Sequence, residues 1–130
     1  MRLFRKPDIA SRLGADLVFS PHFNLFPESP DSRRVITFHD LSFEHYPEFY
    51  PLRKRIWHWQ QDYTRQANRA DALIAVSEFT KNDIVKTLGV PEAKVHVIHS
   101  GVNPRYTPIQ KDDPRLSEFV ARHRLLHPFI

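Results

Sequence analysis

R-A-D-A-L-I-A-V-S-E-F-T-K-N-D-I-V-K-T-L-G, residues 69–89, is the stretch that decides the fold. Its residues 72–76 form an unbroken apolar run, which is typical of a strand that helices cover on both faces. Ser77 is placed to cap the following helix, and Glu78 puts a negative charge at the positive end of the helix dipole. We predict a strand, a turn and a helix in a parallel sheet, with Ser77 at the edge where such sheets bind ligands.

The helical half of this stretch is also well marked. Ile84, Val85 and Leu88 share one face at helical spacing, and Gly89 supplies a left-handed cap before Val90 and Pro91. Phe79 lies nearly opposite that face, so we expect it to pack against something other than this sheet; ligand contact is the alternative.

Composition limits the class of protein. The 130 residues suffice for one domain or part of one, and they include no cysteine, so there is no disulfide framework and no thiolate metal site. No apolar run reaches the length of a membrane span, and the amino terminus lacks the apolar core of a signal peptide, which predicts a soluble, cytoplasmic protein.

A net charge of +4 permits contact with phosphate groups but is more typical of a solvated surface, so we expect no nucleic acid partner. Only three glycines against eleven prolines indicate that a glycine-rich phosphate loop is missing or lies elsewhere.

Three further segments predict strands, at residues 16–20, 35–38 and 94–98, and a helix end closed by Gly14 precedes the first of them. Residues 22–34 contain prolines that exclude a long regular element. Two of the three crossovers suit a parallel sheet, so we predict an α/β fold, a partial Rossmann-like parallel sheet with flanking helices. With four strands, we expect this sheet to be half of a larger one.

His39 and Asp40 directly follow the strand at 35–38. One interpretation is that Asp40 caps the next turn while His39 packs into the protein. The other is that both belong to a functional site, because they lie at a strand's carboxyl end.

Residues 41–50 are rich in aromatic side chains and contain Pro47, so we predict a loop with one helical turn that forms a wall or lid over a cleft. A long helix is then predicted from Pro51 to about residue 68. Its expected core face consists of Leu52, Ile56, Trp59, Tyr63, Ala67 and Ala70. Its expected outer face consists of Lys54, His58, Gln61, Arg65 and Arg69. A cluster at the start of this helix, Arg53, Lys54, Arg55 and Trp57, also suits anionic lipid headgroups; an ordinary solvated face is the simpler interpretation.

Residues 99–130 are predicted to be mostly irregular, unlike the strands and helices that precede them. We expect residues 99–101 to turn the chain sharply, and residues 103–114 resemble a linker between domains. A short helix is predicted at 116–126, and residues 127–130 look like the start of another strand, as if the chain had been cut there.

Three linked segments carry a resemblance to a known family. V-I-T-F-H-D-L-S-F at 35–43, R-A-D-A-L-I-A-V-S-E-F-T-K-N-D-I at 69–84 and K-V-H-V-I-H-S-G-V-N-P-R-Y-T-P at 94–108 resemble the amino-terminal domain of the family 4 glycosyltransferases. The resemblance implies the GT-B architecture, two Rossmann-like domains that face each other across a cleft. Residues 1–106 would be part of the amino-terminal, acceptor-side domain, and residues 107–130 would be the linker and the start of the donor-binding domain.

The resemblance also implies a reaction, namely transfer of a sugar from a nucleoside diphosphate sugar to an acceptor with retention at the anomeric carbon. No cofactor or metal is expected, and the sequence contains no D-x-D carboxylate pair. By the resemblance His39 lies beside the acceptor and the reacting sugar, while Asp40, Ser77 and Glu78 face the cleft. Gly101 would permit a chain reversal near the hinge. Where the family more often has Pro-Asn-Gly-Val-Asp, this chain has His99, Ser100 and Asn103.

The expected partners are a sugar or lipid-linked acceptor and a donor-binding domain acting in trans, with weak peripheral membrane contact. We expect the chain to be inactive alone. Two alternatives stay open: a metal phosphohydrolase that uses His39, Asp40 and His22, and a non-enzymatic module that binds an acceptor or a partner. We also expect the isolated chain to associate through an exposed apolar edge of its sheet.

Overall fold

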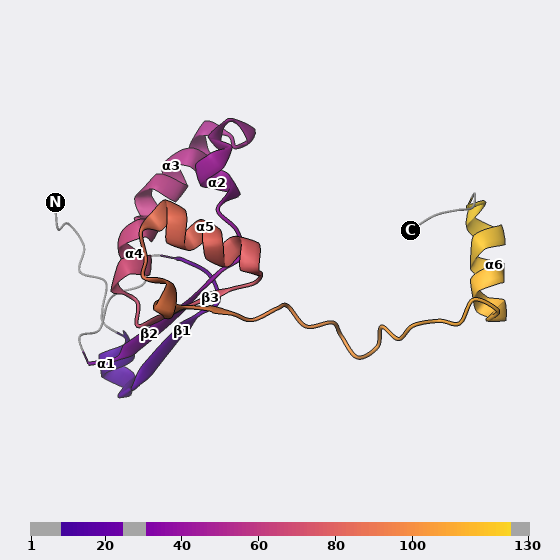
Figure 1. Cartoon of the computed structure of the whole chain (residues 1–130), viewed down its shortest axis with the longest axis horizontal. Helices are drawn as coiled ribbons and strands as arrows, with labels where there is room; N and C mark the ends of the chain where they lie inside the picture. Colours follow the sequence, from indigo (N-terminus) through magenta and orange to yellow (C-terminus); the bar gives the residue numbers. More distant parts are fainter. Residues whose placement is uncertain (1–8, 25–30, 126–130) are drawn as a thin grey trace. The chain divides into compact units, whose positions relative to one another are not determined.

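The structure, a computed structural model, describes residues 9–24 and 31–125. The chain divides into two compact units, of which the first ends at Ser100 and the second begins at Gly101 (Figure 1). Among the described residues, the first unit holds the sheet and nearly all of the helices, and the second holds one helix. Each unit is described by itself.

A four-stranded parallel sheet forms the base of the first unit. Its strand order follows the chain, with β1 (Leu17–Ser20), β2 (Arg33–Phe38), β3 (Ala72–Ala75) and β4 (Val95–Val97). Each of the four predicted strands is present, with ends displaced by one or two residues. The α/β prediction, a Rossmann-like parallel sheet with flanking helices, is therefore confirmed.

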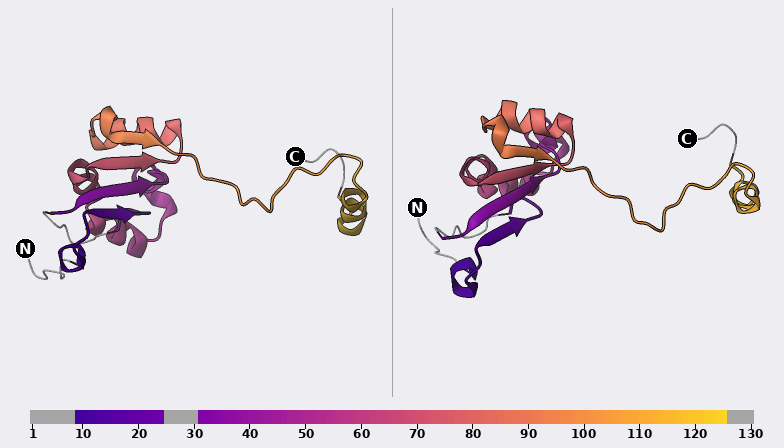
Figure 2. Two further views of the ribbon diagram at one scale, coloured as in Figure 1. Left: turned by 90° about the horizontal axis from the view of Figure 1, so that it is seen from below. Right: turned by 60° about the horizontal axis from the view of Figure 1, so that its bottom comes forward.

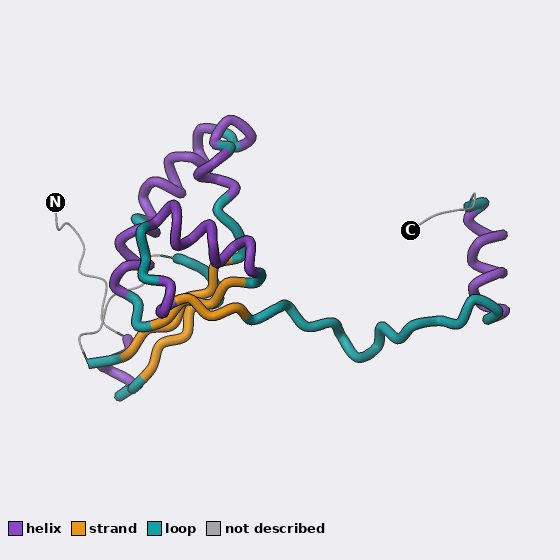
Figure 3. The backbone as a smooth tube through the Cα atoms, viewed as in Figure 1, coloured by secondary structure: helices purple, strands orange, loops and turns teal. Residues whose placement is uncertain are grey.

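The helices that connect the strands lie on one side of this sheet (Figures 1 and 3). Successive right-handed crossovers that advance in one direction across a sheet place their helices on the same face, so the strand order accounts for the layering. The helical elements of the first unit are α1 (Ile9–Leu13), α2 (Ser42–His45), the 3-10 helix η1 (Pro47–Phe49), α3 (Leu52–Gln61), α4 (Tyr63–Arg69), α5 (Glu78–Leu88) and the 3-10 helix η2 (Glu92–Lys94).

The prediction that β3 is covered on both faces is wrong for the part of the chain that the structure describes. Leu73 and Ala75 are buried under the helices, whereas Ala72 and Ile74 on the opposite face are only partly buried. The further view from below shows the strands in front of the helices (Figure 2). On β1 the exposure is greater, since Leu17 is 53% and Phe19 55% exposed. The sheet therefore has one packed face and one largely open face.

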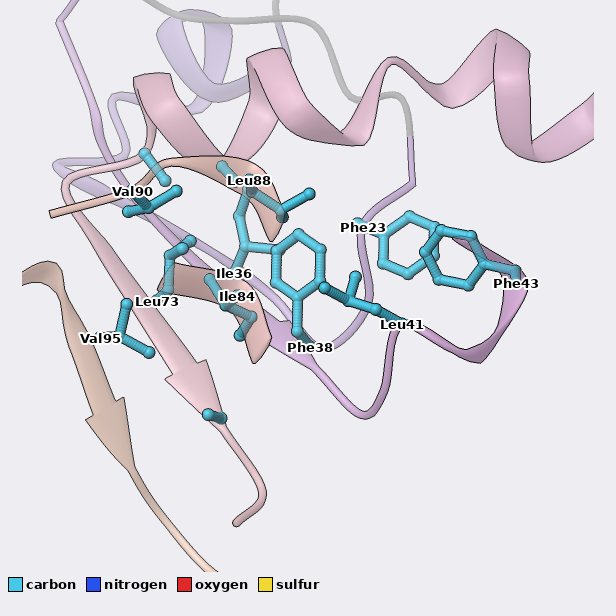
Figure 4. Packing of buried hydrophobic residues seen from close by; sticks show 13 residues of the cluster. Phe23, Ile36, Phe38, Leu41, Phe43, Leu73, Ile84, Leu88, Val90 and Val95 are labelled. Carbon is cyan, nitrogen blue, oxygen red and sulfur yellow. The ribbon is translucent and has the colours of Figure 1, made fainter. Parts of the chain in front are cut away.

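The core lies between the packed face and α5 (Figure 4). Ile36 and Phe38 of β2 and Leu73 of β3 are fully buried together with Ile84 of α5, while Leu88 is 5% exposed. The predicted inner face of the helix is thus confirmed. Burying a side chain of this size contributes about 1.5–3 kcal/mol, so each of these contacts stabilises the unit substantially.

Both ends of α5 form as the sequence predicts. Ser77 has extended backbone and its hydroxyl accepts from the Thr80 backbone N–H at 3.1 Å, while Gly89 has a φ of 65°. Phe79 differs from expectation, because it is 80% exposed rather than packed.

The single long helix predicted from Pro51 to residue 68 is two helices. Asp62 separates them in the left-handed conformation with a φ of 48°, which aspartate tolerates better than most residues. The predicted faces hold only for α4, where Ala67 and the adjoining Ala70 are buried. On α3 they are wrong, since Gln61 is buried and the expected core residues Leu52, Ile56 and Trp59 are 68%, 47% and 79% exposed.

A buried polar contact explains why the two helices sit this way. Arg34, 8% exposed on the packed face of β2, donates to the Gln66 side-chain oxygen at 2.7 Å. The Gln66 amide in turn donates to the Gln61 carbonyl, and the Asp71 carboxylate accepts from the Arg34 backbone N–H at 2.7 Å. A buried guanidinium needs acceptors, and the Gln66 side chain supplies one, so this polar side chain of α4 turns inward.

The second unit contains α6 (Pro114–His123), which begins two residues before the predicted helix. Asp113 caps it by accepting from the Arg115 backbone N–H at 2.9 Å. Residues 99–101 do not form the expected turn, and Gly101 has no positive φ, so the predicted need for glycine there is wrong. The strand predicted at 127–130 lies outside the described residues. No helix within residues 9–24 and 31–125 is long and apolar enough to cross a bilayer.

Candidate active site at the carboxyl edge of the sheet

The carboxyl ends of β1 and β2 bring two histidines together. His22 follows β1 and His39 follows β2, and their ring centroids lie 6.1 Å apart with the planes inclined by 25°. The parallel register places Ser20 opposite Ile36, which brings the two strand ends to the same edge of the sheet. This edge is where open α/β sheets bind ligands.

His39 is exposed, and among the described residues its ring forms one hydrogen bond. Its Nε2 lies 3.1 Å from the Pro21 carbonyl oxygen. A carbonyl can only accept, so Nε2 carries the proton, and in the neutral ring Nδ1 is then an acceptor. The interpretation that His39 packs into the protein is wrong; its ring offers an oriented acceptor at the surface.

Asp40 does cap the turn that follows, as one interpretation predicts. Its Oδ1 accepts from the Ser42 backbone N–H at 2.8 Å and from the Ser42 hydroxyl at 2.6 Å. The Ser42 hydroxyl also lies 2.7 Å from the Tyr50 hydroxyl, which joins the turn to the end of η1. Burial acts to raise the pKa of Asp40, but the bonds from Ser42 and the nearby His39 and His22 hold it below its usual value. Asp40 is therefore a carboxylate at neutral pH.

Thr80 connects the two strand ends that the sequence singles out. Its hydroxyl donates to the His39 carbonyl at 3.3 Å and lies 3.0 Å from the Ser77 hydroxyl. Thr80 is 5% exposed, whereas Glu78 beside it is exposed at the first turn of α5. Ser77, Glu78, His39 and the turn at Asp40 thus share one edge of the sheet.

An aromatic cluster lies behind this edge. His58 of α3 stacks on Phe43 of α2, with ring centroids 4.3 Å apart and planes inclined by 4°. Phe23 lies between His22, at 4.2 Å, and Phe43, at 5.0 Å. The Nδ1 atoms of His22 and His58 are buried and have no hydrogen-bond partner among the described residues.

Burial lowers the pKa of both histidines. For His22 the neighbouring His39 adds to the effect and Asp40 opposes it; for His58, Lys54 and His22 add and Asp40 again opposes. Both rings are therefore neutral at pH 7.

Gly101, the remaining predicted site residue, belongs to the second unit, so its place in the site stays a prediction. At the end of β4 it is His99 that is held, with Nδ1 donating to the Val76 carbonyl at 3.1 Å. Sequence reasoning did not identify Thr80, and it considered His22 only as a metal ligand. The available signal for His22 was its place just after a strand, the same signal that identifies His39.

The described residues contain no group of three or more histidine, aspartate or glutamate side chains that could hold a metal ion. His22, His39 and Asp40 therefore do not form the metal-binding group that a phosphohydrolase would need among the described residues. What the edge does offer is hydrogen bonding, from the His39 acceptor and from the exposed carboxylates of Asp40 and Glu78. Such groups suit a ligand rich in hydroxyls.

Most of the sequence matches a family model. That model is Glycosyltransferase Family 4, and the match covers residues 2–106, which include every strand of the sheet. A comparison with curated proteins finds no match.

Proposed function

Because the chain belongs to glycosyltransferase family 4, we propose that it forms the acceptor side of an enzyme that transfers a sugar from a nucleoside diphosphate sugar to an acceptor. In this reaction the bond between the anomeric carbon and the diphosphate breaks, and a bond to an acceptor oxygen forms. We propose that the configuration at the anomeric carbon is retained and that the domain takes its place in a GT-B enzyme.

The observation that carries the proposal is the state of His39. It is exposed at the carboxyl end of β2, its Nε2 is occupied by the Pro21 carbonyl, and its Nδ1 is left to accept a hydrogen bond. A sugar hydroxyl would be a suitable donor to Nδ1. His39 would thereby orient the reacting sugar or the acceptor, and orientation of this kind is a large part of the rate enhancement in group transfer.

The neighbouring residues would have supporting roles. Asp40 holds the turn beside His39 and keeps one carboxylate oxygen free of the two bonds from Ser42. Ser77 and Thr80 join α5 to the His39 backbone, so they would position the site rather than bind the substrate. Glu78, exposed in the first turn of α5, would contact an acceptor hydroxyl.

The partners that we propose are a sugar or lipid-linked acceptor and a donor-binding domain, which would supply the contacts to the nucleotide. The cysteine-free sequence supports a cytoplasmic location, where disulfides are rare.

The test uses the full 130-residue chain with labelled nucleoside diphosphate sugars, alone and after addition of the donor-binding domain of a family 4 enzyme. We expect no donor binding by the chain alone and sugar transfer in the mixture, unaffected by a chelator. Tight donor binding by the chain alone would contradict the proposed division of labour. Acceptor binding without transfer in any mixture would instead support a non-enzymatic binding module.

A further inference from the structure

α3 carries an apolar stripe that faces away from the core. Leu52, Ile56 and Trp59 are 68%, 47% and 79% exposed, and their spacing of four and three residues places them on one face of the helix. Gln61 lies on the opposite face and is buried. A helix of a soluble unit normally presents its apolar stripe to the core, so this reversed arrangement needs an explanation.

The stripe continues into η1. Phe49 is 77% and Tyr46 53% exposed, and their rings stack with centroids 5.6 Å apart. An open pocket with a volume of about 370 Å³ lies between the two elements. Its lining includes Pro47, Tyr50, Leu52, Ile56 and Trp59. In Figure 1 α2 and the start of α3 form the end of the first unit farthest from the strands. We call Tyr46, Phe49, Leu52, Ile56 and Trp59 the tip surface.

Three consecutive cations lie in the first turn of α3, and two of them border the tip surface. At 3.6 residues per turn, Arg53 and Arg55 lie on either side of the stripe, and Lys54 lies behind it. All three are exposed, and within the described part of the chain none of them forms an ion pair. Two acids, Glu44 and Glu48, are also exposed nearby, but the Glu44 carboxylate accepts a hydrogen bond from the Tyr63 hydroxyl.

We propose that the tip surface binds the surface of an anionic lipid membrane, with α3 lying in the plane of the interface. Leucine and isoleucine would enter the boundary of the acyl chains, tryptophan and tyrosine would lie at the level of the headgroups, and the flanking arginines would pair with lipid phosphates. The charge complementarity favours this partner over an apolar protein surface, which would leave Arg53 and Arg55 without counter-charges. The inference is independent of the proposed sugar transfer.

The test is flotation of the full chain with lipid vesicles through a density gradient, which separates vesicle-bound protein from aggregates. Vesicles of phosphatidylcholine alone are compared with vesicles of phosphatidylcholine and phosphatidylglycerol in equal parts. We expect binding only to the anionic vesicles, and we expect high salt to weaken it. Replacing Arg53, Lys54 and Arg55 by Gln should lower the affinity about 30-fold, because Arg53 and Arg55 would each contribute about 1 kcal/mol near an anionic surface, whereas Lys54 lies behind the stripe. The matched control replaces three exposed cations elsewhere, Lys86, Arg105 and Lys111, by Gln.

Tryptophan fluorescence provides a second readout, since the chain has two tryptophans. On addition of anionic vesicles we expect a blue shift that Trp57→Phe retains and Trp59→Phe loses, because Trp59 belongs to the tip surface. Three outcomes would overturn the proposal: no flotation with anionic vesicles, equal flotation with neutral vesicles, or equal weakening by the control triple variant. If the tip surface binds a protein and not lipid, the chain will not float with anionic vesicles. Vesicle binding and sugar transfer are measured separately, so either proposal can fail alone.

Discussion

The Thr80 hydroxyl donates to the backbone carbonyl of His39 at 3.3 Å and so joins the first turn of α5 to the end of β2. The two residues are 41 positions apart in the sequence. The same hydroxyl lies 3.0 Å from that of Ser77, so the helix cap and the candidate site share one small network. The position of the exposed His39 therefore depends on a buried threonine.

Replacing Thr80 by Val tests this link. The variant keeps the shape of the side chain but removes the hydroxyl, which leaves the His39 carbonyl and the Ser77 hydroxyl without this partner. We expect a loss of about 1–2 kcal/mol in the free energy of unfolding, measured by urea denaturation. Thr87→Val is the matched control, because Thr87 lies in the same helix, is exposed, and donates to the Asp83 carboxylate at 2.9 Å. Equal losses in the two variants would show that the bond to His39 contributes nothing.

Replacing His39 by Ala tests the candidate site itself. His39 is exposed, so we expect the free energy of unfolding to change by less than about 0.5 kcal/mol. Transfer in the presence of a donor-binding domain should fall about 100-fold, as expected when a group that orients substrate is lost. His96→Ala is the control, because His96 is also exposed but lies on the open face of β4. Unchanged transfer by His39→Ala would remove His39 from the site.

The partly buried histidines His22 and His58 predict a dependence of stability on pH. Burial lowers the pKa of His22 and of His58 in the folded state, so below about pH 6.5 the unfolded chain binds more protons than the folded chain. The full stability is therefore present above pH 6.5, and part of it is lost as the pH falls from 6.5 through the folded-state pKa values. The lowered pKa of Asp40 acts in a separate window, because its contribution is present above about pH 4 and lost as the pH falls through its folded-state pKa.

Urea denaturation between pH 7.5 and pH 5.5 measures the histidine contribution. His58→Phe should make stability less dependent on pH, since phenylalanine can stack on Phe43 as His58 does but takes up no proton. His96→Phe, at an exposed position, should leave the pH dependence as it is. A pH dependence that is equally steep in His58→Phe and in the unmodified chain would show that His58 does not contribute.

The strands and α5 could be predicted because their signals are local. The apolar run at 72–76, the cap at Ser77 and the glycine at 89 lie close together in the sequence. Each of them determines the structure of its own immediate neighbours. The orientation of α3 could not be predicted in this way. It depends on Arg34 in β2, which draws Gln66 inward, and on the left-handed Asp62, which ends the helix. Periodicity alone assigned the exposed stripe of Leu52, Ile56 and Trp59 to the core.

In the candidate site, too, the local features could be predicted from the sequence, and the contacts between distant residues could not. A histidine after a strand is visible in the sequence, and the parallel sheet then places His39 at the functional edge. The approach of His22 to His39 depends on the pairing of β1 with β2, with Ser20 opposite Ile36, and no local pattern specifies that register. The contact from Thr80 likewise depends on how α5 packs against the sheet.

The open face of the sheet leads to the last prediction, that the isolated chain associates through β1. Leu17 and Phe19 point to this face and are more than half exposed, and β1 is the outermost strand of the described sheet. An apolar edge strand with unpaired backbone groups is a template for pairing with another chain. We expect sedimentation velocity to show association that increases with concentration, and Phe19→Lys should reduce it because a charge on an edge strand opposes pairing. Phe119→Lys, at a residue of α6 that is 52% exposed, makes the same substitution outside the sheet and should not reduce it. A sharp melting transition of a monomer at all concentrations would contradict the prediction.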